Sequence, residues 1–308
     1  MHLKRVIFLF VVLSAVLYLA WQTVTAVPES KVGNLAAQLD DANATNREYA
    51  TAELLEIGEQ AVPELLAMIN TVEPRRIEWL RRHVPAELIP APSCTRAQAL
   101  HALEVLGPQA ERAIPEMLAL LDGRSSPQRA AKILIAIGTP AVAPVTRALT
   151  TNTNAYIQAQ LLRILGEMHT NATPAVPDIS LYTTSAESDL RSAAAVALGQ
   201  IHTEPDESIA ALQKLLRDEN PSVRAAAAAA LGGFGHAAAP AKLELLEATG
   251  DVSASVRLAA ARAVLELGDA RAAEIALRQL AEDADPQNRL AAQNLAEEAT
   301  SKVGELPP

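Results

Sequence analysis

The chain has 308 residues, of which 50% are hydrophobic and only 3% aromatic, and its formal net charge is −10 at pH 7. This acidic balance argues against a nucleic-acid-binding module, because such modules present a basic face to the phosphates. The single cysteine, Cys94, excludes an intramolecular disulfide and a cysteine-rich metal site.

Residues 1–27 have the layout of a targeting segment. Lys4 and Arg5 precede a long apolar run, and Ala26 supplies a small residue for cleavage. The run is also just long enough to span a bilayer. The pattern therefore predicts either a cleaved signal peptide or an uncleaved anchor, with residues 6–27 in the membrane. Both alternatives place the rest of the chain outside the cytoplasm, as an exported, periplasmic, extracellular or membrane-anchored protein, since the basic residues stay inside.

The next part of the chain repeats one pattern of apolar residues seven times. Each copy ends at an anchor residue, which is a glycine or a histidine in its place. The anchors are Gly58, Gly107, Gly138, His169, His202, Gly235 and Gly268. Residues one, four and eight positions before each anchor are apolar, as Ile57, Leu54 and Ala50 show in the first copy. These offsets fall on one face of a helix, so each copy predicts a helix with an apolar stripe that ends at a left-handed residue.

A second helix is expected after each anchor. Five of the seven copies carry a proline near its start, where the missing N–H would be unpaired anyway. These prolines are Pro63, Pro115, Pro144, Pro177 and Pro240. Each repeat is therefore predicted to be two helices joined by a tight turn.

An arginine stands eleven residues before five of the anchors. These residues are Arg47, Arg96, Arg191, Arg224 and Arg257. The two other copies have Pro127 and Gln158 at this position. Because the arginine recurs with the repeat, we interpret it as structural. It can cap helix carbonyls or pair with an acid of the adjacent repeat.

The pattern resembles the HEAT repeat, in particular the short bacterial version named after phycobilisome lyases. Residues 224–235 match it best, and 191–201 match it nearly as well. The resemblance implies an all-α fold, an α-solenoid of about seven two-helix repeats at 34–299, in which a final helix at about 286–299 caps the stack. In that family the second helices line the concave binding surface. Residues 300–308 are expected to form a C-terminal tail.

The first interval between anchors is the longest and contains an insertion at 71–93. Its centre is basic and carries a tryptophan. We select Arg75, Arg76, Trp79, Arg81 and Arg82 as candidate partner-binding residues. Arginine recognises carboxylates and phosphates, and tryptophan is a common interface anchor. Alternatively, Ile77, Leu80 and Val84 pack an amphipathic helix onto the first repeats, and arginine stems cover the tryptophan.

His169 and His202 occupy the turn position of consecutive repeats, and His236 follows an anchor glycine. We interpret them as helix-end caps, because no acidic residue supplies an evident third metal ligand. The chain has no nucleophile elbow, Walker loop, dinucleotide fingerprint or zinc helix motif. We therefore expect no catalytic residue, no cofactor and no metal.

These observations predict a non-catalytic protein-binding scaffold or adaptor, with a protein partner and no nucleic acid. The expected second helices carry charges of both signs, which favours a protein or peptide ligand over a polyanion. The charges are Glu64, Glu116, Arg147, Lys214, Arg217, Lys242, Glu244, Glu247, Arg271 and Arg278. Two alternatives stay open: a lyase or lyase-chaperone-like protein, implied only by the resemblance, and a purely structural envelope spacer.

Overall fold

The computed structural model describes residues 30–70, 95–123 and 126–304. Within these ranges the regular secondary structure is entirely helical. The chain divides between Leu120 and Leu121 into two compact units, here called unit 1 and unit 2.

Unit 1 contains the single helix α2 and the first two repeats. Its elements are α2 (Lys31–Gln38), α3 (Ala44–Ile57), η1 (Gly58–Ala61), α4 (Val62–Asn70), α6 (Arg96–Leu106), η3 (Gly107–Ala113) and α7 (Ile114–Leu121). Helix α2 begins after Ser30, whose hydroxyl accepts a hydrogen bond from the Gly33 amide at 2.9 Å. Leu54, Leu65 and Leu103 are fully buried and form part of its core.

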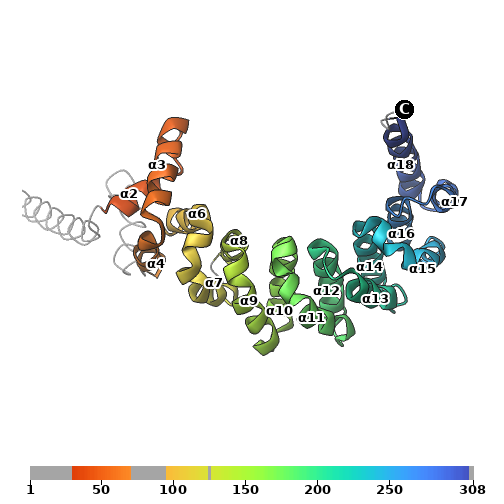
Figure 1. Cartoon of the computed structure of the whole chain (residues 1–308), viewed down its shortest axis with the longest axis horizontal. Coiled ribbons are helices and arrows are strands. Elements are labelled where there is room, and N and C mark those ends of the chain that lie inside the picture. The colour runs from red at the N-terminus through yellow and green to blue at the C-terminus, as the bar shows by residue number, and fades with distance from the viewer. Residues whose placement is uncertain (1–29, 71–94, 124–125, 305–308) are drawn as a thin grey trace, which may run out of the picture. The chain divides into compact units, whose positions relative to one another are not determined.

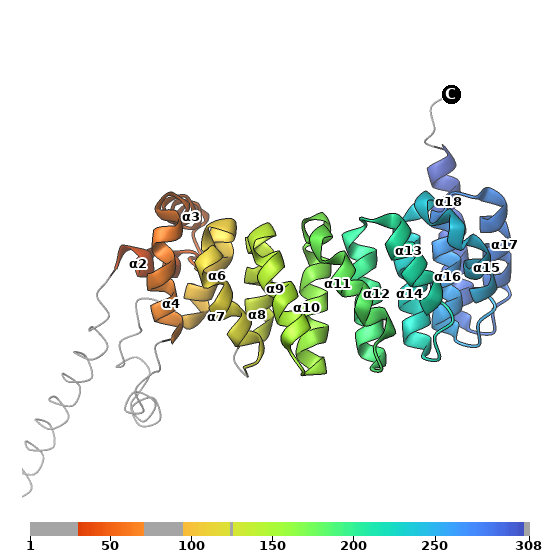
Figure 2. The ribbon, with the colours of Figure 1, turned by 60° about the horizontal axis from the view of Figure 1, so that its bottom comes forward.

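Unit 2 contains repeats three to seven and the final helix, and its helix pairs follow one another in chain order (Figure 1, Figure 2). Its elements are α8 (Pro127–Ile137), α9 (Thr139–Thr151), α10 (Ala155–Glu167), η4 (His169–Ala175), α11 (Val176–Leu181), η5 (Tyr182–Thr184), α12 (Ser188–Ile201), α13 (Pro205–Leu215), α14 (Pro221–Gly233), η6 (Gly235–Ala241), α15 (Lys242–Ala248), α16 (Ala254–Glu266), α17 (Ala270–Ala281) and α18 (Pro286–Gly304). Helix α18 extends into the predicted tail, because no glycine or proline interrupts it before Gly304.

The seven anchor residues all adopt a positive φ, as the repeat pattern predicted. The angles are 62° at Gly58, 53° at Gly107, 72° at Gly138, 52° at His169, 55° at His202, 53° at Gly235 and 77° at Gly268. Gly138 combines its φ with a ψ of −133°, a combination that side chains strongly disfavour. His202 has a ψ of 27° and lies in the left-handed helical region, which costs a non-glycine residue roughly 1–2 kcal/mol.

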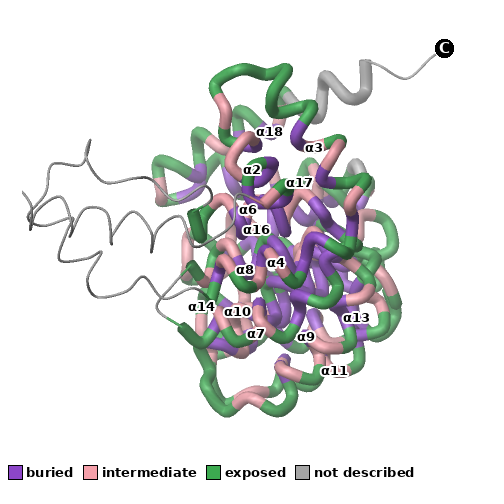
Figure 3. The backbone as a smooth tube through the Cα atoms, turned by 90° about the vertical axis from the view of Figure 1, so that its left-hand side faces the viewer, coloured by how far each residue is buried: buried purple, intermediate pink, exposed green. Residues whose placement is uncertain are grey.

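Small residues bring the first helices of unit 2 close together. A Cβ atom added at Gly199 in α12 would lie 2.6 Å from the Cβ of Ala230 in α14. One added at Gly232 in α14 would lie 2.9 Å from the Cα of Ala263 in α16. Figure 3 shows the buried residues in the interior between the helices and exposed residues on the outer turns. The core is therefore a thin layer between neighbouring helices, as expected for a solenoid.

Two of the five predicted first-turn prolines lie elsewhere. Pro144 is inside α9, because this helix begins directly after Gly138, and Pro140 takes the first-turn position. Pro240 lies in η6, just before α15. In most repeats a 3-10 turn lies between the anchor and the second helix. The second helix therefore begins later in the chain than the sequence pattern predicted.

Candidate protein-binding site

Three arginines of the predicted series join consecutive repeats in unit 2. In each pair, Nε and Nη2 donate to the two oxygens of one carboxylate. The pairs are Arg191–Asp218 (2.7 and 2.9 Å), Arg224–Asp251 (2.7 and 2.8 Å) and Arg257–Asp283 (2.6 and 2.6 Å). Asp218 and Asp251 precede the first helix of the following repeat, and Asp283 precedes the final helix α18. These bidentate pairs, here called the ladder, therefore tie repeats five, six and seven to the element that follows each of them.

The same arginines also cap carbonyls within their own repeat. Nη1 of Arg224 donates to the carbonyl oxygens of Asp218 at 2.8 Å and Glu219 at 3.1 Å. Equivalent Nη1 bonds are made by Arg47, Arg191, Arg257 and Arg289. The structural interpretation of the arginine, capping combined with an acidic partner, is thus confirmed for the three ladder residues.

The acidic partner follows a regular spacing that the repeat pattern above did not include. Aspartates Asp41, Asp218, Asp251 and Asp283 stand six residues before Arg47, Arg224, Arg257 and Arg289. The carboxylate of Asp218 accepts from the Asn220 amide at 2.9 Å, and that of Asp251 accepts from the Ser253 amide at 2.8 Å. Asp218, Asp251 and Asp283 are here called the ladder aspartates. Hydrogen bonds from the arginines hold the pKa of each of them below the usual range of an aspartate. These carboxylates therefore stay ionised near neutral pH.

Neutral contacts replace the ladder earlier in unit 2. Gln158 stands at the arginine position of α10, and its Nε2 donates to the Asn152 carbonyl at 2.8 Å and the Tyr182 hydroxyl at 3.3 Å. The Tyr182 hydroxyl donates to the Leu149 carbonyl at 2.8 Å. Burial raises the pKa of Tyr182, so this hydroxyl stays protonated. Repeats three and four are thus joined here by uncharged hydrogen bonds.

The turn histidines bind backbone carbonyls. Nδ1 of His169 and Nδ1 of His202 each lie 3.2 Å from the Gln200 carbonyl oxygen. The His202 ring also packs edge-on against Phe234, with centroids 5.3 Å apart. These contacts agree with the predicted capping role. No cluster of three or more histidine, cysteine or acidic side chains suited to a metal ion occurs within the described ranges.

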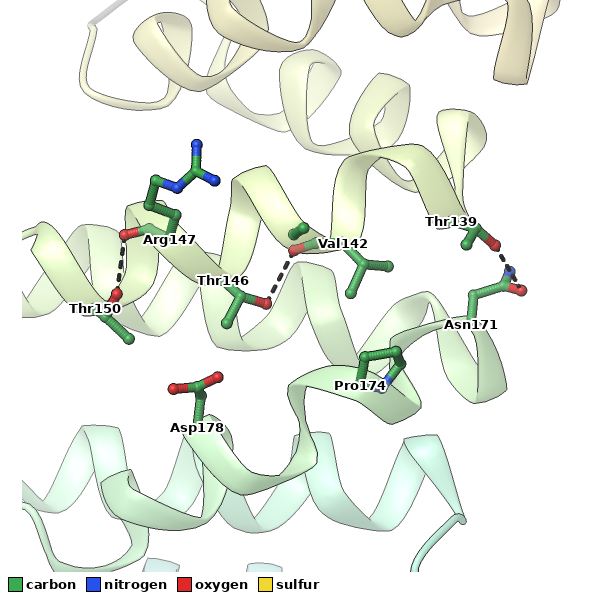
Figure 4. A pocket seen from close by; sticks show the side chains of 9 residues that line it. Thr139, Val142, Thr146, Arg147, Thr150, Asn171, Pro174 and Asp178 are labelled. Carbon is green, nitrogen blue, oxygen red and sulfur yellow. Dashed lines mark hydrogen bonds between the residues drawn. The ribbon is translucent and has the colours of Figure 1, made fainter.

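A groove lies between α9 and the η4–α11 segment of unit 2 (Figure 4). Its volume is about 460 Å³. Its walls are formed by Thr139, Val142, Ala143, Thr146, Arg147, Thr150, Asn171, Pro174 and Asp178. One wall comes from a second helix and the other from the following repeat, so the groove belongs to the surface that the resemblance assigned to binding.

The polar groups of the groove leave both donors and acceptors for a ligand. Thr146 and Thr150 donate to main-chain carbonyls of α9 at 2.9 and 3.1 Å, so their oxygen lone pairs stay available. Thr139 donates to Oδ1 of Asn171 at 3.3 Å, which leaves the amide N–H groups free to donate. Arg147 and Asp178 form no side-chain hydrogen bond or ion pair with the described residues. Figure 4 shows the guanidinium turned away from the Asp178 carboxylate.

Several other charges on the second helices are already paired. Lys242 contacts Asp269 at 2.8 Å, and Arg278 contacts Glu274 at 2.9 Å. Nη2 of Arg217 lies 3.8 Å from Oε2 of Glu247 in the following repeat. Lys214 is exposed and has no ionic partner in the part of the chain that the structure describes. Arg147 and Lys214 are therefore cations of this face that can bind a partner without breaking an ion pair.

The candidate residues of the insertion, Arg75, Arg76, Trp79, Arg81 and Arg82, lie outside the described residues. The same holds for Cys94 and residues 1–27. The insertion site and the targeting segment therefore stay predictions. In the described ranges, none of the helices combines the length and the apolar character needed to cross a bilayer.

Paired helices, positive-φ turns and an arginine–aspartate ladder define an α-solenoid of HEAT-like repeats. Residues 176–249 and 209–296 match the family model described as HEAT repeats. The predicted resemblance to the HEAT-repeat family is therefore confirmed, and the matched part of unit 2 consists of HEAT repeats.

The chain is also similar to solved structures. The chain is similar to a crystal structure of a Kap121p mutant, with 14% identity and a TM-score of 0.53, over 88% of this chain and 34% of that chain. It is also similar to an engineered protein (19% identity, TM-score 0.40, 93% of this chain and 94% of that chain) and to the complex of CpcE and CpcF of phycocyanin lyase from Nostoc sp. PCC7120 (23% identity, TM-score 0.35, 80% and 91%). A comparison with curated proteins found no match. At 14% identity, the similarity to the Kap121p mutant shows the fold alone.

Proposed function

We propose that this chain is a non-catalytic scaffold that binds a protein partner on the second helices of unit 2. The groove between α9 and α11 carries the proposal, because Arg147 and Asp178 line it without a side-chain partner among the described residues, and its threonine oxygens can still accept hydrogen bonds. HEAT-like stacks suit this role, since stacked repeats create extended binding surfaces. Charges of both signs in one groove favour a peptide over a polyanion, because Asp178 would repel the latter.

The test of this function is partner capture that depends on the groove. Tagged full-length protein is cross-linked in cells and purified from the envelope fraction, alongside Arg147→Glu and Arg262→Glu variants. Arg262 is exposed on α16, a first helix, so it provides the same charge change away from the groove. We expect a protein that is captured by the wild type and by Arg262→Glu but lost with Arg147→Glu. Capture that is equal in all three, or absent from all three, contradicts groove binding; complete absence favours the spacer.

The pattern of residues 1–27 supports a location outside the cytoplasm, either exported or anchored by one N-terminal helix. Cell fractionation combined with N-terminal sequencing of the mature protein tests this part of the proposal. A new N-terminus directly after Ala26 indicates a cleaved signal peptide, and an intact N-terminus in the membrane fraction indicates an anchor. An intact chain in the cytoplasmic fraction contradicts both.

A further inference from the structure

One exposed position recurs on consecutive second helices of unit 2. It lies two residues after a fully buried residue of the same helix, and these buried residues are Val145, Ile179, Leu212 and Leu245. The exposed position is occupied by Arg147, Leu181, Lys214 and Glu247. These four residues, here called the second-helix row, belong to α9, α11, α13 and α15 in turn.

Contacts between repeats show that members of the row adjoin. Arg147 lines the groove together with Asp178, which lies one helical turn before Leu181. Helix α11 contacts α13 directly. Arg217, one turn after Lys214, lies 3.8 Å from Glu247. The row is therefore a strip that passes from one repeat to the next within unit 2.

The first three members of the row are basic, apolar and basic. Arg147 is the single charged residue of α9, and Leu181 is 68% exposed. Lys214 follows with no ionic partner among the described residues. In a chain of net charge −10, two exposed cations without an ion-pair partner favour an anionic partner, and the exposed leucine between them favours an apolar side chain.

The repeat spacing sets the spacing of the ligand. Packed helices lie ~8–10 Å apart, whereas a polyproline II chain advances ~3.1 Å per residue and returns to the same face every third residue. A polyproline II peptide that follows the row therefore advances by about three residues for each repeat. A partner side chain that meets Leu181 lies about three residues from those that meet Arg147 and Lys214.

We propose that the row binds a peptide segment in the polyproline II conformation, in which an apolar residue lies between two acidic residues, each about three positions away. The carboxylates pair with Arg147 and Lys214, and the apolar side chain packs on Leu181. Asp178 and the groove threonines accept hydrogen bonds from peptide N–H groups. The inference rests on the proposed function and specifies the chemistry of its partner. A nucleic acid fits less well, because its phosphates recur at every nucleotide and would also meet Asp178 and Glu247, whereas the peptide places carboxylates only at Arg147 and Lys214.

Fluorescence anisotropy with the full chain tests the inference. The probe is a fluorescein-labelled peptide of sequence SESSLSSES, and its counterparts replace both glutamates by lysine or the leucine by serine. We expect the first probe to bind at least tenfold more tightly than the lysine peptide, and the leucine-free peptide to bind more weakly. Wild-type protein that binds no probe, or binds the lysine peptide equally well, overturns the inference.

Charge reversal supplies the matched variants. Arg147→Glu combined with Lys214→Glu should weaken the acidic probe at least tenfold and strengthen the lysine peptide. Arg262→Glu should change neither, and unchanged circular dichroism spectra show that both variants fold. If the double variant and Arg262→Glu bind the acidic probe with equal affinity, the inference is overturned. If the probe fails but partner capture still depends on Arg147, the proposed function stands without this peptide chemistry; if capture is also independent of Arg147, both fail.

Discussion

Replacing Arg224 by alanine removes one rung of the ladder and leaves the Asp251 carboxylate without its cation. The two side chains are only 12% and 14% exposed. Removing one partner of a fully buried ion pair costs about 3–5 kcal/mol, because the remaining charge is uncompensated. Some water reaches this pair, and we therefore expect Arg224→Ala to lower the free energy of unfolding by about 2–3 kcal/mol.

Arg289→Ala is the matched control within the same unit. Nη1 of Arg289 donates to the carbonyls of Asp283 and Ala284 at 2.7 and 3.0 Å, as in the ladder arginines. Its guanidinium has no carboxylate partner among the described residues. Loss of these carbonyl bonds costs about 1 kcal/mol, so the difference between the variants isolates the ion pair.

The assay is thermal unfolding of both variants and the wild type at pH 7, followed by far-ultraviolet circular dichroism. One kcal/mol corresponds to roughly 2–4 °C for a unit of this size, so Arg224→Ala should lower Tm by about 5–10 °C and Arg289→Ala by about 3 °C. Equal shifts for the two variants would refute the reasoning, since the ion pair would then contribute nothing. Adding Asp251→Asn to Arg224→Ala should recover part of the loss, because the unpaired charge is removed.

Three further predictions concern pH and the glycines. The pKa of the ladder aspartates is lower in the folded state than in the unfolded state. The stability that they contribute is therefore complete above pH ~5 and is lost as pH falls below ~4. Urea midpoints that stay constant from pH ~7 to pH ~3 would contradict this prediction. Gly138→Ala should cost about 1–3 kcal/mol in urea unfolding through backbone strain alone, because the nearest atom to a new Cβ is Nδ2 of Asn171 at 3.8 Å. Gly199→Ala should cost about 1–3 kcal/mol by overpacking, since the new Cβ would lie 2.6 Å from the Cβ and 2.7 Å from the Cα of Ala230. A urea midpoint equal to that of the wild type would contradict this prediction.

The repeat architecture could be predicted from the sequence because its signals are local. Apolar offsets within a single helix identified the buried face, and a residue as unlike glycine as His202 was placed correctly at a positive-φ turn. The prediction depended on position within the repeat rather than on residue type. Periodicity of this kind survives substitutions, because each helix must bury the same stripe.

The sequence predicted that the arginines can pair with an acid of the adjacent repeat, but it identified neither the aspartates that do so nor the groove, for different reasons. Asp251 lies 27 residues after Arg224, in a loop whose other residues vary, so a search for helical periodicity passes over it. Arg147 was noted only as one charge among several. The walls of its groove come from separate repeats, and their separation depends on helix packing that no local pattern encodes.

The distribution of the ladder has a mechanical consequence. Ion pairs hold the junctions that follow Arg191, Arg224 and Arg257. Beside α9, Gln158 and Tyr182 form only neutral hydrogen bonds, which resist deformation less. Bending should therefore concentrate at the junction of repeats three and four, where less electrostatic energy resists it. The groove lies at this more flexible junction, so its width can adjust to a ligand. The later repeats, which the ion pairs hold together, would then move as one rigid body.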